Sequence, residues 1–288
     1  MGDQIRKKAF SMYAYYNGAF ISGSITLPLT DRGLLFGDGV FETMIYQNGK
    51  INYLDDHLIR LTKSLDALSI DKPNLRASKL SDIAIELLQK NSIDETARFK
   101  LAAWRKSKKQ FGYGSSDRDC NLMLSVQRCD PIDLKIVSKI GYAQSIRNYP
   151  LPHSNFKTIS SLSYIMAANE CTSMQKEELI ILDTEGHLSE CTASNLFWIE
   201  DDTLFTPALT TGCVNGIMRK QLSKYCFEIN ASFKEVEKKP KVLKQADHVF
   251  CVNIAGINVF NEIGSNHYST KSDLLDKIIE MILDPRGS

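Results

Sequence analysis

Apolar and polar residues alternate in two early stretches of the chain that also carry strong turn signals. Asn17-Gly18 and Asn48-Gly49 each stand between runs rich in Tyr, Ile and Val. An Asn-Gly pair between two β-prone runs favours a tight hairpin. We therefore predict hairpins over residues 13–22 and 40–53, followed by strands at residues 97–104 and 121–127.

Helical spacing appears between these strands and again in the second half of the chain. In residues 54–68, apolar side chains recur every three or four positions, and two aspartates stand where the first turn would be. Their charge favours the N-terminus of a helix. Further helices are predicted at residues 80–90, 160–174 and 272–283 and from near Asn215, and further strands at residues 135–143, 179–183, 193–199 and 248–252.

A change of domain is predicted where Asp130-Pro131-Ile132-Asp133 interrupts the pattern, because proline disfavours the continuation of regular structure. This gives an N-terminal α+β domain over residues 1–130 and a C-terminal domain over residues 131–288. Residues 1–11 are polar and are expected to be an extension, with Met12 as an alternative start.

The composition of the chain argues against several classes of protein. With 288 residues, 43% hydrophobic and 24% charged, the chain has an ordinary globular composition and enough length for two modest domains. A net charge of +1 gives no general attraction to nucleic acids or acidic membranes, and no apolar run is long enough to span a bilayer. Seven cysteines without a Cys-x-x-Cys pair argue against a disulfide framework and a zinc site, and favour a cytoplasmic location.

Two segments carry the strongest chemical signal. The first reads Ser-Glu-Cys-Thr-Ala-Ser-Asn-Leu-Phe-Trp over residues 189–198, and the second reads Thr-Gly-Cys-Val-Asn-Gly-Ile-Met-Arg over residues 211–219. Along the chain, these segments place an acid beside small polar residues, then a strand, then a turn that begins with glycine and leads into a helix. That order suits a buried carboxylate facing a ring nitrogen, with a phosphate held at a helix N-terminus.

Together with residues 32–42 (Arg-Gly-Leu-Leu-Phe-Gly-Asp-Gly-Val-Phe-Glu) and Lys157, these segments resemble the class IV aminotransferases. Enzymes of that family are the fold type IV enzymes of pyridoxal 5′-phosphate (PLP). The resemblance runs from about Tyr13 to the last predicted helix. It implies a two-domain α+β fold of the D-amino-acid aminotransferase type. The small α/β N-terminal domain would be joined to a larger C-terminal domain with a β-barrel-like core.

The resemblance also implies roles for cofactor-binding residues. Lys157 matches the catalytic lysine that bonds to PLP, Glu190 matches the acid that faces the pyridine nitrogen, and Arg60 matches a phosphate-binding arginine. Taken from their local segments alone, Lys157 and Arg60 would be solvated charges and Glu190 a turn acid. Backbone amides are expected to complete the phosphate site, at Ile217, Met218, Ile254 and Ala255.

Substrate-binding residues are less clearly marked. Phe41 stands where some transaminases place a tyrosine near the substrate carboxylate, and the loop of residues 106–114 matches a segment that reaches the active site of a partner subunit. The family's arginine is missing at about Phe111, so another cation must take its place. The predicted substrate residues are Phe41, Arg105, Lys108, Lys109, Phe111 and Tyr113.

Two enzymatic functions and one binding function remain open at this point. The motifs favour an aminodeoxychorismate lyase type of enzyme, which makes 4-aminobenzoate and pyruvate from 4-amino-4-deoxychorismate. A transaminase acting on branched-chain or D-amino acids with 2-oxoglutarate is the alternative. Lys157, Glu190 and Arg60 together argue against a PLP-binding protein without turnover or a two-domain binding module. We expect a homodimer that takes a small-molecule substrate and binds neither nucleic acid, membrane nor metal.

Overall fold

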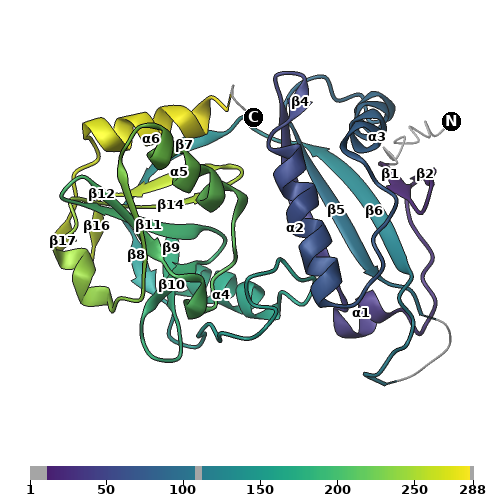
Figure 1. The fold of residues 1–288 in the computed structure, drawn as a ribbon, viewed down its shortest axis with the longest axis horizontal. Coiled ribbons are helices and arrows are strands. Elements are labelled where there is room, and N and C mark those ends of the chain that lie inside the picture. Colours follow the sequence, from purple (N-terminus) through teal and green to yellow (C-terminus); the bar gives the residue numbers. More distant parts are fainter. Residues whose placement is uncertain (1–11, 108–111, 286–288) are drawn as a thin grey trace, which may run out of the picture.

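The computed structural model describes residues 12–107 and 112–285, in two halves that lie side by side (Figure 1). The first half is built on a six-stranded sheet of order β2-β1-β6-β5-β3-β4. Its strands are β1 (Tyr13–Tyr16), β2 (Ala19–Ser22), β3 (Gly39–Gln47), β4 (Lys50–Ile51), β5 (Ala97–Arg105) and β6 (Cys120–Arg128). Both predicted hairpins are confirmed, with Asn17 and Asn48 in the left-handed conformation at their turns.

Helices cover one face of this first sheet. They are α2 (Leu54–Ala67) and α3 (Ala77–Lys90), preceded by the short α1 (Arg32–Phe36). Met44 of β3, Leu65 of α2 and Leu87 of α3 belong to one buried cluster between the helices and the sheet. Because side chains alternate along a strand, Phe41, Thr43 and Arg98 lie on the opposite face.

The second half contains two sheets, packed face to face with helices on the outside. One has the order β13-β12-β11-β14-β15-β7 and the other β10-β9-β8-β16-β17, and in the part of the chain that the structure describes these strands form no single closed barrel. The strands are β7 (Asp133–Val137), β8 (Ile140–Tyr142), β9 (Glu178–Leu182), β10 (Leu188–Cys191), β11 (Asn195–Glu200), β12 (Thr203–Pro207), β13 (Ser232–Val236), β14 (His248–Asn253), β15 (Gly256–Phe260), β16 (Glu262–Ile263) and β17 (Asn266–His267).

Three apolar clusters hold these layers together. α5 (Ile217–Glu228) and α6 (Asp273–Leu283) pack on the six-stranded sheet through residues such as Leu222 and Ile278. Trp198 and Ile180 belong to the cluster between the two sheets. α4 (Leu162–Ser173) packs its Ala167 against the five-stranded sheet. Two short 3-10 turns, Leu209–Thr211 and Pro240–Lys244, complete the connections.

The prediction of one continuous strand over residues 135–143 is wrong, because two strands of different sheets lie there. The chain leaves one sheet after β7 and enters the other at β8, which pair with β15 and β9 respectively. Between them, the backbone amides of Ser138 and Lys139 both donate to the Glu177 carboxylate at 2.9 Å. Hydrophobic alternation continues through this step, so the pattern does not reveal the change of sheet. The sequence analysis also missed α1 and the short strands β10, β12, β13, β15, β16 and β17.

The two halves join at several points besides the connection between β6 and β7. The backbone of Phe41 in β3 donates to the carbonyl of Lys157, and Ile159 donates to the carbonyl of Gly39, each at 2.9 Å. Elsewhere, Asp56 of α2 accepts hydrogen bonds from Lys220 and Gln221 of α5. These contacts bring the edge of β3 against the second half. Among the described residues, none of the helices is long and apolar enough to cross a membrane.

Candidate active site

A cavity of about 320 Å³ opens between the two halves, a volume within the range of small-molecule sites. The first half contributes the exposed face of its sheet and the first two turns of α2. The second half contributes the segment before α4, the turn after β10 and the start of α5. Residues from both halves line the cavity, among them Phe41, Thr43, Arg98, Lys157, Glu190 and Ile217.

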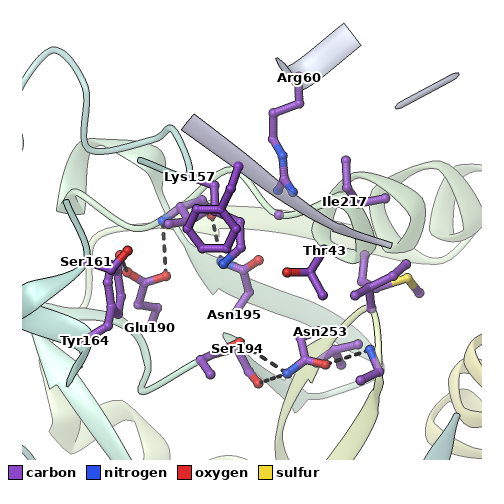
Figure 2. Close-up of a pocket in the computed structure, with 18 of the residues that line it drawn as sticks. Thr43, Arg60, Lys157, Ser161, Tyr164, Glu190, Ser194, Asn195, Ile217 and Asn253 are labelled. Atoms are coloured by element: carbon purple, nitrogen blue, oxygen red, sulfur yellow. Dashed lines mark hydrogen bonds between the residues drawn. The ribbon is translucent and has the colours of Figure 1, made fainter. Parts of the chain in front are cut away.

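Lys157 is placed by its backbone. Residues 157–159 run beside the edge of β3, and this pairing directs the Lys157 side chain into the cavity (Figure 2). Its Nζ lies 4.5 Å from the centre of the Phe41 ring. Burial, and then the charge of Arg60, lower the pKa of Lys157 below its usual range. A larger share of this amine is therefore neutral, which is the form that can act as a nucleophile or a base.

Glu190 lies on the floor of the cavity, at the end of β10, and its side chain is 3% exposed. The Tyr164 hydroxyl and the Asn148 amide donate to Oε1 at 2.7 and 2.8 Å, and the backbone amide of Val214 donates to Oε2 at 3.1 Å. Figure 2 shows Glu190 and Tyr164 side by side. Burial raises the pKa of Glu190 in spite of these bonds, so the carboxylate would gain from a cationic partner in the cavity.

The N-terminus of α5 faces the same cavity. Gly216 is the residue before the first turn, and among the described residues no side chain caps the helix. The amides of Ile217 and Met218 belong to that turn, where helical geometry supplies no acceptor. Asn195 packs directly on the glycine: a Cβ at position 216 would lie 2.0 Å from the Asn195 side-chain oxygen. The site therefore requires glycine and leaves a helix N-terminus open to an anion.

Arg60 reaches the cavity from α2, and two of its nitrogens are held by the Glu42 carboxylate at 2.8 and 2.5 Å. A third bond runs from Nη1 to the carbonyl of Asn215, 3.0 Å away. His57 Nδ1 completes the cluster, 2.6 Å from Glu42. Burial alone would raise the pKa of Glu42, but Arg60 and His57 outweigh it and the pKa is lowered. The arginine thus keeps two N–H donors for a ligand beside α5.

The turn after β14 only partly fits its predicted role. Ile254 and Ala255 both line the cavity. The amide of Ala255, however, donates to the Asn253 side chain at 2.8 Å. Asn253 is fixed in turn by Ser194, whose hydroxyl accepts from it at 3.0 Å (Figure 2). The structure therefore does not support the Ala255 amide as a hydrogen-bond donor to the phosphate. Of the two residues predicted in this turn, only Ile254 keeps that predicted role.

The residues present fit PLP. Burial raises the pKa of Glu190, so a positive charge beside this carboxylate would stabilise its ionised form. The protonated pyridine nitrogen of PLP would supply that charge. The uncapped first turn of α5 and the remaining donors of Arg60 suit a phosphate. Lys157 supplies the amine.

Comparison with known proteins agrees with this geometry. Residues 39–257 match the family model described as amino-transferase class IV. The chain belongs to the class IV aminotransferases. It is therefore an enzyme, and like the other enzymes of its family it uses PLP.

Relatives of this aminotransferase-family enzyme differ in their reactions. The chain is 28% identical over 273 residues to an aminodeoxychorismate lyase of Bacillus subtilis, covering 93% of this chain and 92% of that one. It is 27% identical over 242 residues to a D-alanine aminotransferase of Bacillus licheniformis, covering 83% of each. A branched-chain aminotransferase from Thermoproteus uzoniensis, solved with norvaline, shares the fold, with a TM-score of 0.84, 23% identity and 96% of both chains covered.

On the substrate side of the class IV site, the structure separates the predicted residues. Phe41 lines the cavity. Arg105 does not belong to the described lining, because its guanidinium donates to Asp38 and to the carbonyls of Leu68, Ser69 and Asp117. The substrate role predicted for Arg105 is therefore not supported.

The loop that follows β5 is described only in part. Lys108, Lys109 and Phe111 lie outside the described residues, and their roles stay predictions. Tyr113 is exposed and lies beside Phe36 of α1, with ring centres 5.4 Å apart, rather than at the cavity of its own chain. Its carbonyl accepts from Arg32 at 2.7 Å. Tyr113 remains a candidate for the site of a partner subunit.

Sequence reasoning missed several residues of this class IV site. Glu42 was visible as an acid within an otherwise apolar strand, and such a residue demands a buried partner. Arg98 could have been found from the face it shares with Phe41 and Thr43. Asn148 and Tyr164 come from two distant segments and meet only at Glu190. No local pattern marks these two residues.

Proposed function

We propose that this class IV enzyme is an aminodeoxychorismate lyase, which converts 4-amino-4-deoxychorismate into 4-aminobenzoate and pyruvate. The observation that carries the proposal is the position of Lys157 Nζ over the flat, apolar ring of Phe41. A planar six-membered ring can pack against Phe41 and present its amine-bearing carbon to that lysine. The similarity to the B. subtilis lyase over almost the whole chain supports the same choice.

Each residue of the cavity has a part in this reaction. When bound, PLP supplies an electron sink for the pair left on the carbon that carries the amine. Lys157 removes the proton from that carbon, and its lowered pKa provides the neutral amine needed to do so. Glu190 holds a proton at the pyridine nitrogen. Arg60 and the start of α5 hold the phosphate, so that the cofactor stays fixed while pyruvate leaves.

The chemistry balances without another reactant. The two products together contain all the atoms of the substrate, so no oxidant, reductant or second amino acid takes part. A transaminase would need the same first proton transfer and then a 2-oxo acid as acceptor. The D-alanine and branched-chain aminotransferases among the relatives keep this function as the second candidate.

The test compares both reactions on the purified holoenzyme. One set of reactions receives 4-amino-4-deoxychorismate, and 4-aminobenzoate and pyruvate are measured. Another receives D-alanine or L-valine with 2-oxoglutarate, and glutamate is measured. We expect equal amounts of the two lyase products, and transamination at the level of the Lys157→Ala control. Transamination that exceeds lyase turnover would overturn the proposal in favour of the second candidate.

We further propose that the enzyme is a cytoplasmic homodimer. Apolar side chains on α4 and α1 point outward: Leu162, Ile165 and Met166 are 66%, 56% and 46% exposed, and Leu34 is 69% exposed. The two helices belong to one surface, because Gly37 after α1 lies against Ser160 before α4. A second copy covering this surface would bury it, as exposed apolar patches of this kind require.

Measurement of the oligomeric state in solution tests this second proposal directly. Light scattering of the wild-type protein is expected to give the mass of two chains. Ile165→Glu should shift the mass toward one chain, whereas Phe227→Glu, at an exposed apolar residue of α5, should leave the dimer intact. A wild-type protein of single-chain mass with full activity would show that this surface does not bind a second copy.

A further inference from the structure

Arg98 is a cation in the cavity that the cofactor does not account for. It lies on β5, lines the cavity, and has its Nε buried without a hydrogen-bond partner. Across the part of the chain that the structure describes, its guanidinium forms neither a hydrogen bond nor an ion pair. A buried donor without an acceptor is costly, so an unpaired Arg98 indicates that a ligand supplies the missing oxygen.

Other arginines that are buried or half-buried in the fold show how unusual this is. Arg32 and Arg105 both pair with Asp38, and Arg219 pairs with Glu235. Arg60, on the far side of β3, pairs with Glu42. Each of these guanidinium groups therefore forms an ion pair with an acid of the chain itself. Arg98 is half-buried, as Arg60 is, but has no such acid among the described residues.

The strand register places Arg98 on the substrate side of the cavity. Arg98 is opposite Ile45 in the β3–β5 ladder, and Thr43, the next residue of β3 on the same face, is opposite Lys100. The Thr43 hydroxyl faces the cavity (Figure 2). Glu42, which anchors Arg60, points to the opposite face of the same strand. Arg60 is thus directed to the phosphate region and Arg98 to the face that carries Phe41.

We propose that Arg98 binds the carboxylate of the substrate from within its own subunit. Its planar fork can give two parallel hydrogen bonds to a carboxylate, which a lysine cannot match. It would thereby take over the role for which the sequence offered Arg105 and the loop lysines. The inference rests on the proposed function only in requiring a substrate that carries a carboxylate, as both candidate substrates do.

Binding measurements on the holoenzyme separate this role from a structural one. The variants are Arg98→Gln, which removes the charge, and Arg98→Lys, which keeps it. Arg128→Gln is the matched control, because Arg128 is an exposed arginine on the neighbouring strand β6. Absorbance titrations use two acid and amide pairs as probes: 4-aminobenzoate with 4-aminobenzamide, and 4-methylvalerate with 4-methylvaleramide. Titration with PLP gives the cofactor affinity of each variant.

Arg98→Gln should weaken binding of the acids by roughly 10- to 100-fold, the value of a charge-assisted hydrogen bond, and leave the amides unchanged. The Michaelis constant should rise by a similar factor with little change in kcat, as for lost ground-state binding. Arg98→Lys should restore part of the loss, and Arg128→Gln should match the wild type.

Three outcomes would overturn the inference. One is a wild-type enzyme that binds neither acid more tightly than its amide. Another is an Arg98→Gln variant with unchanged acid binding. The third is a parallel loss of PLP affinity, which would place Arg98 at the cofactor. A failure of the lyase assay alone is distinguishable, because a carboxylate preference that disappears in Arg98→Gln would support Arg98 and reject only the lyase reaction.

Discussion

The two walls of the cavity are held in different ways. On the cofactor wall, formed by Lys157, Glu190 and the start of α5, the carboxylate of Glu190 is fixed by three hydrogen bonds from other parts of the chain. On the substrate wall, formed by Phe41, Thr43 and Arg98, the guanidinium of Arg98 has no partner among the described residues. We therefore expect the chemistry shared by the family to depend on the cofactor wall and the specificity to depend on the substrate wall, where a side chain can change without disturbing its neighbours.

Lys157→Ala should have the largest effect, because it removes the reacting amine from the cofactor wall. Loss of its proton transfer alone costs about 10²- to 10⁴-fold in turnover, and loss of the covalent bond to PLP adds to this. Borohydride reduction of the wild-type holoenzyme followed by peptide mapping should place the label on Lys157. Label on a different lysine would show that the cofactor wall has been misassigned.

Glu190→Gln should slow turnover by about 10²- to 10³-fold while PLP stays bound, because a neutral amide cannot keep the pyridine nitrogen protonated. Tyr164→Phe should have a smaller effect of the same kind, since it removes only one of the donors that fix the carboxylate. Rates of proton removal from a deuterated substrate check both variants. Near-normal rates in Glu190→Gln would contradict its role and the contrast between the two walls.

Arg60→Ala should weaken PLP binding by roughly 10- to 100-fold, the cost of a charge-assisted hydrogen bond. It should also lower the free energy of unfolding by about 3–5 kcal/mol, because the buried Glu42 carboxylate loses its arginine and keeps only His57 as a partner. The double variant Arg60→Ala with Glu42→Gln should recover most of the stability but not the PLP affinity. An unchanged dissociation constant for PLP would mean that Arg60 serves only to neutralise Glu42.

The Arg60–Glu42 pair also predicts that, in the apoprotein, the stability of the wild type and the stability of Arg60→Ala change in opposite directions with pH. The pKa of Glu42 lies below its usual 4.5 in the folded wild type, so its contribution to stability is full above that pH and is lost as the pH falls through the folded pKa. In Arg60→Ala, burial should raise this pKa, and stability should instead fall as the pH rises above about 4.5. Thermal unfolding across this pH range tests the reversal of sign.

The smallest effect is expected for Lys108→Ala combined with Lys109→Ala. A lysine meets an anion as a point charge without the geometry of the Arg98 fork, so the Michaelis constant should rise only about two- to fivefold with kcat little changed. Steady-state kinetics on the purified holoenzyme measures this, with Arg98→Gln as the comparison. A rise larger than that of Arg98→Gln would move the main carboxylate contact from the strand to the loop.

The cofactor wall could be predicted from the sequence because its parts occupy short continuous segments. The order of an acid, a strand and a Gly-led helix marks Glu190 and the Gly216–Met218 turn, and the resemblance to class IV aminotransferases implies their roles. The substrate wall could not be predicted in the same way. Arg98 is one of several cations along β5 and its neighbourhood, and only the strand register and the absence of an acid partner in the described chain separate it from Arg105. The switch between sheets at Ser138 was hidden because both sheets bury the same kind of side chain.

The hydrogen bonds between β3 and residues 157–159 also bear on how the enzyme diversifies. They join Phe41 N to Lys157 O and Ile159 N to Gly39 O, and therefore use peptide groups that any residue except proline can supply. The attachment of the Lys157 segment to the first sheet therefore does not depend on the neighbouring side chains. First halves exchanged between relatives should consequently dock in the same alignment, and a chimaera would acquire a new substrate range while the lysine keeps its place.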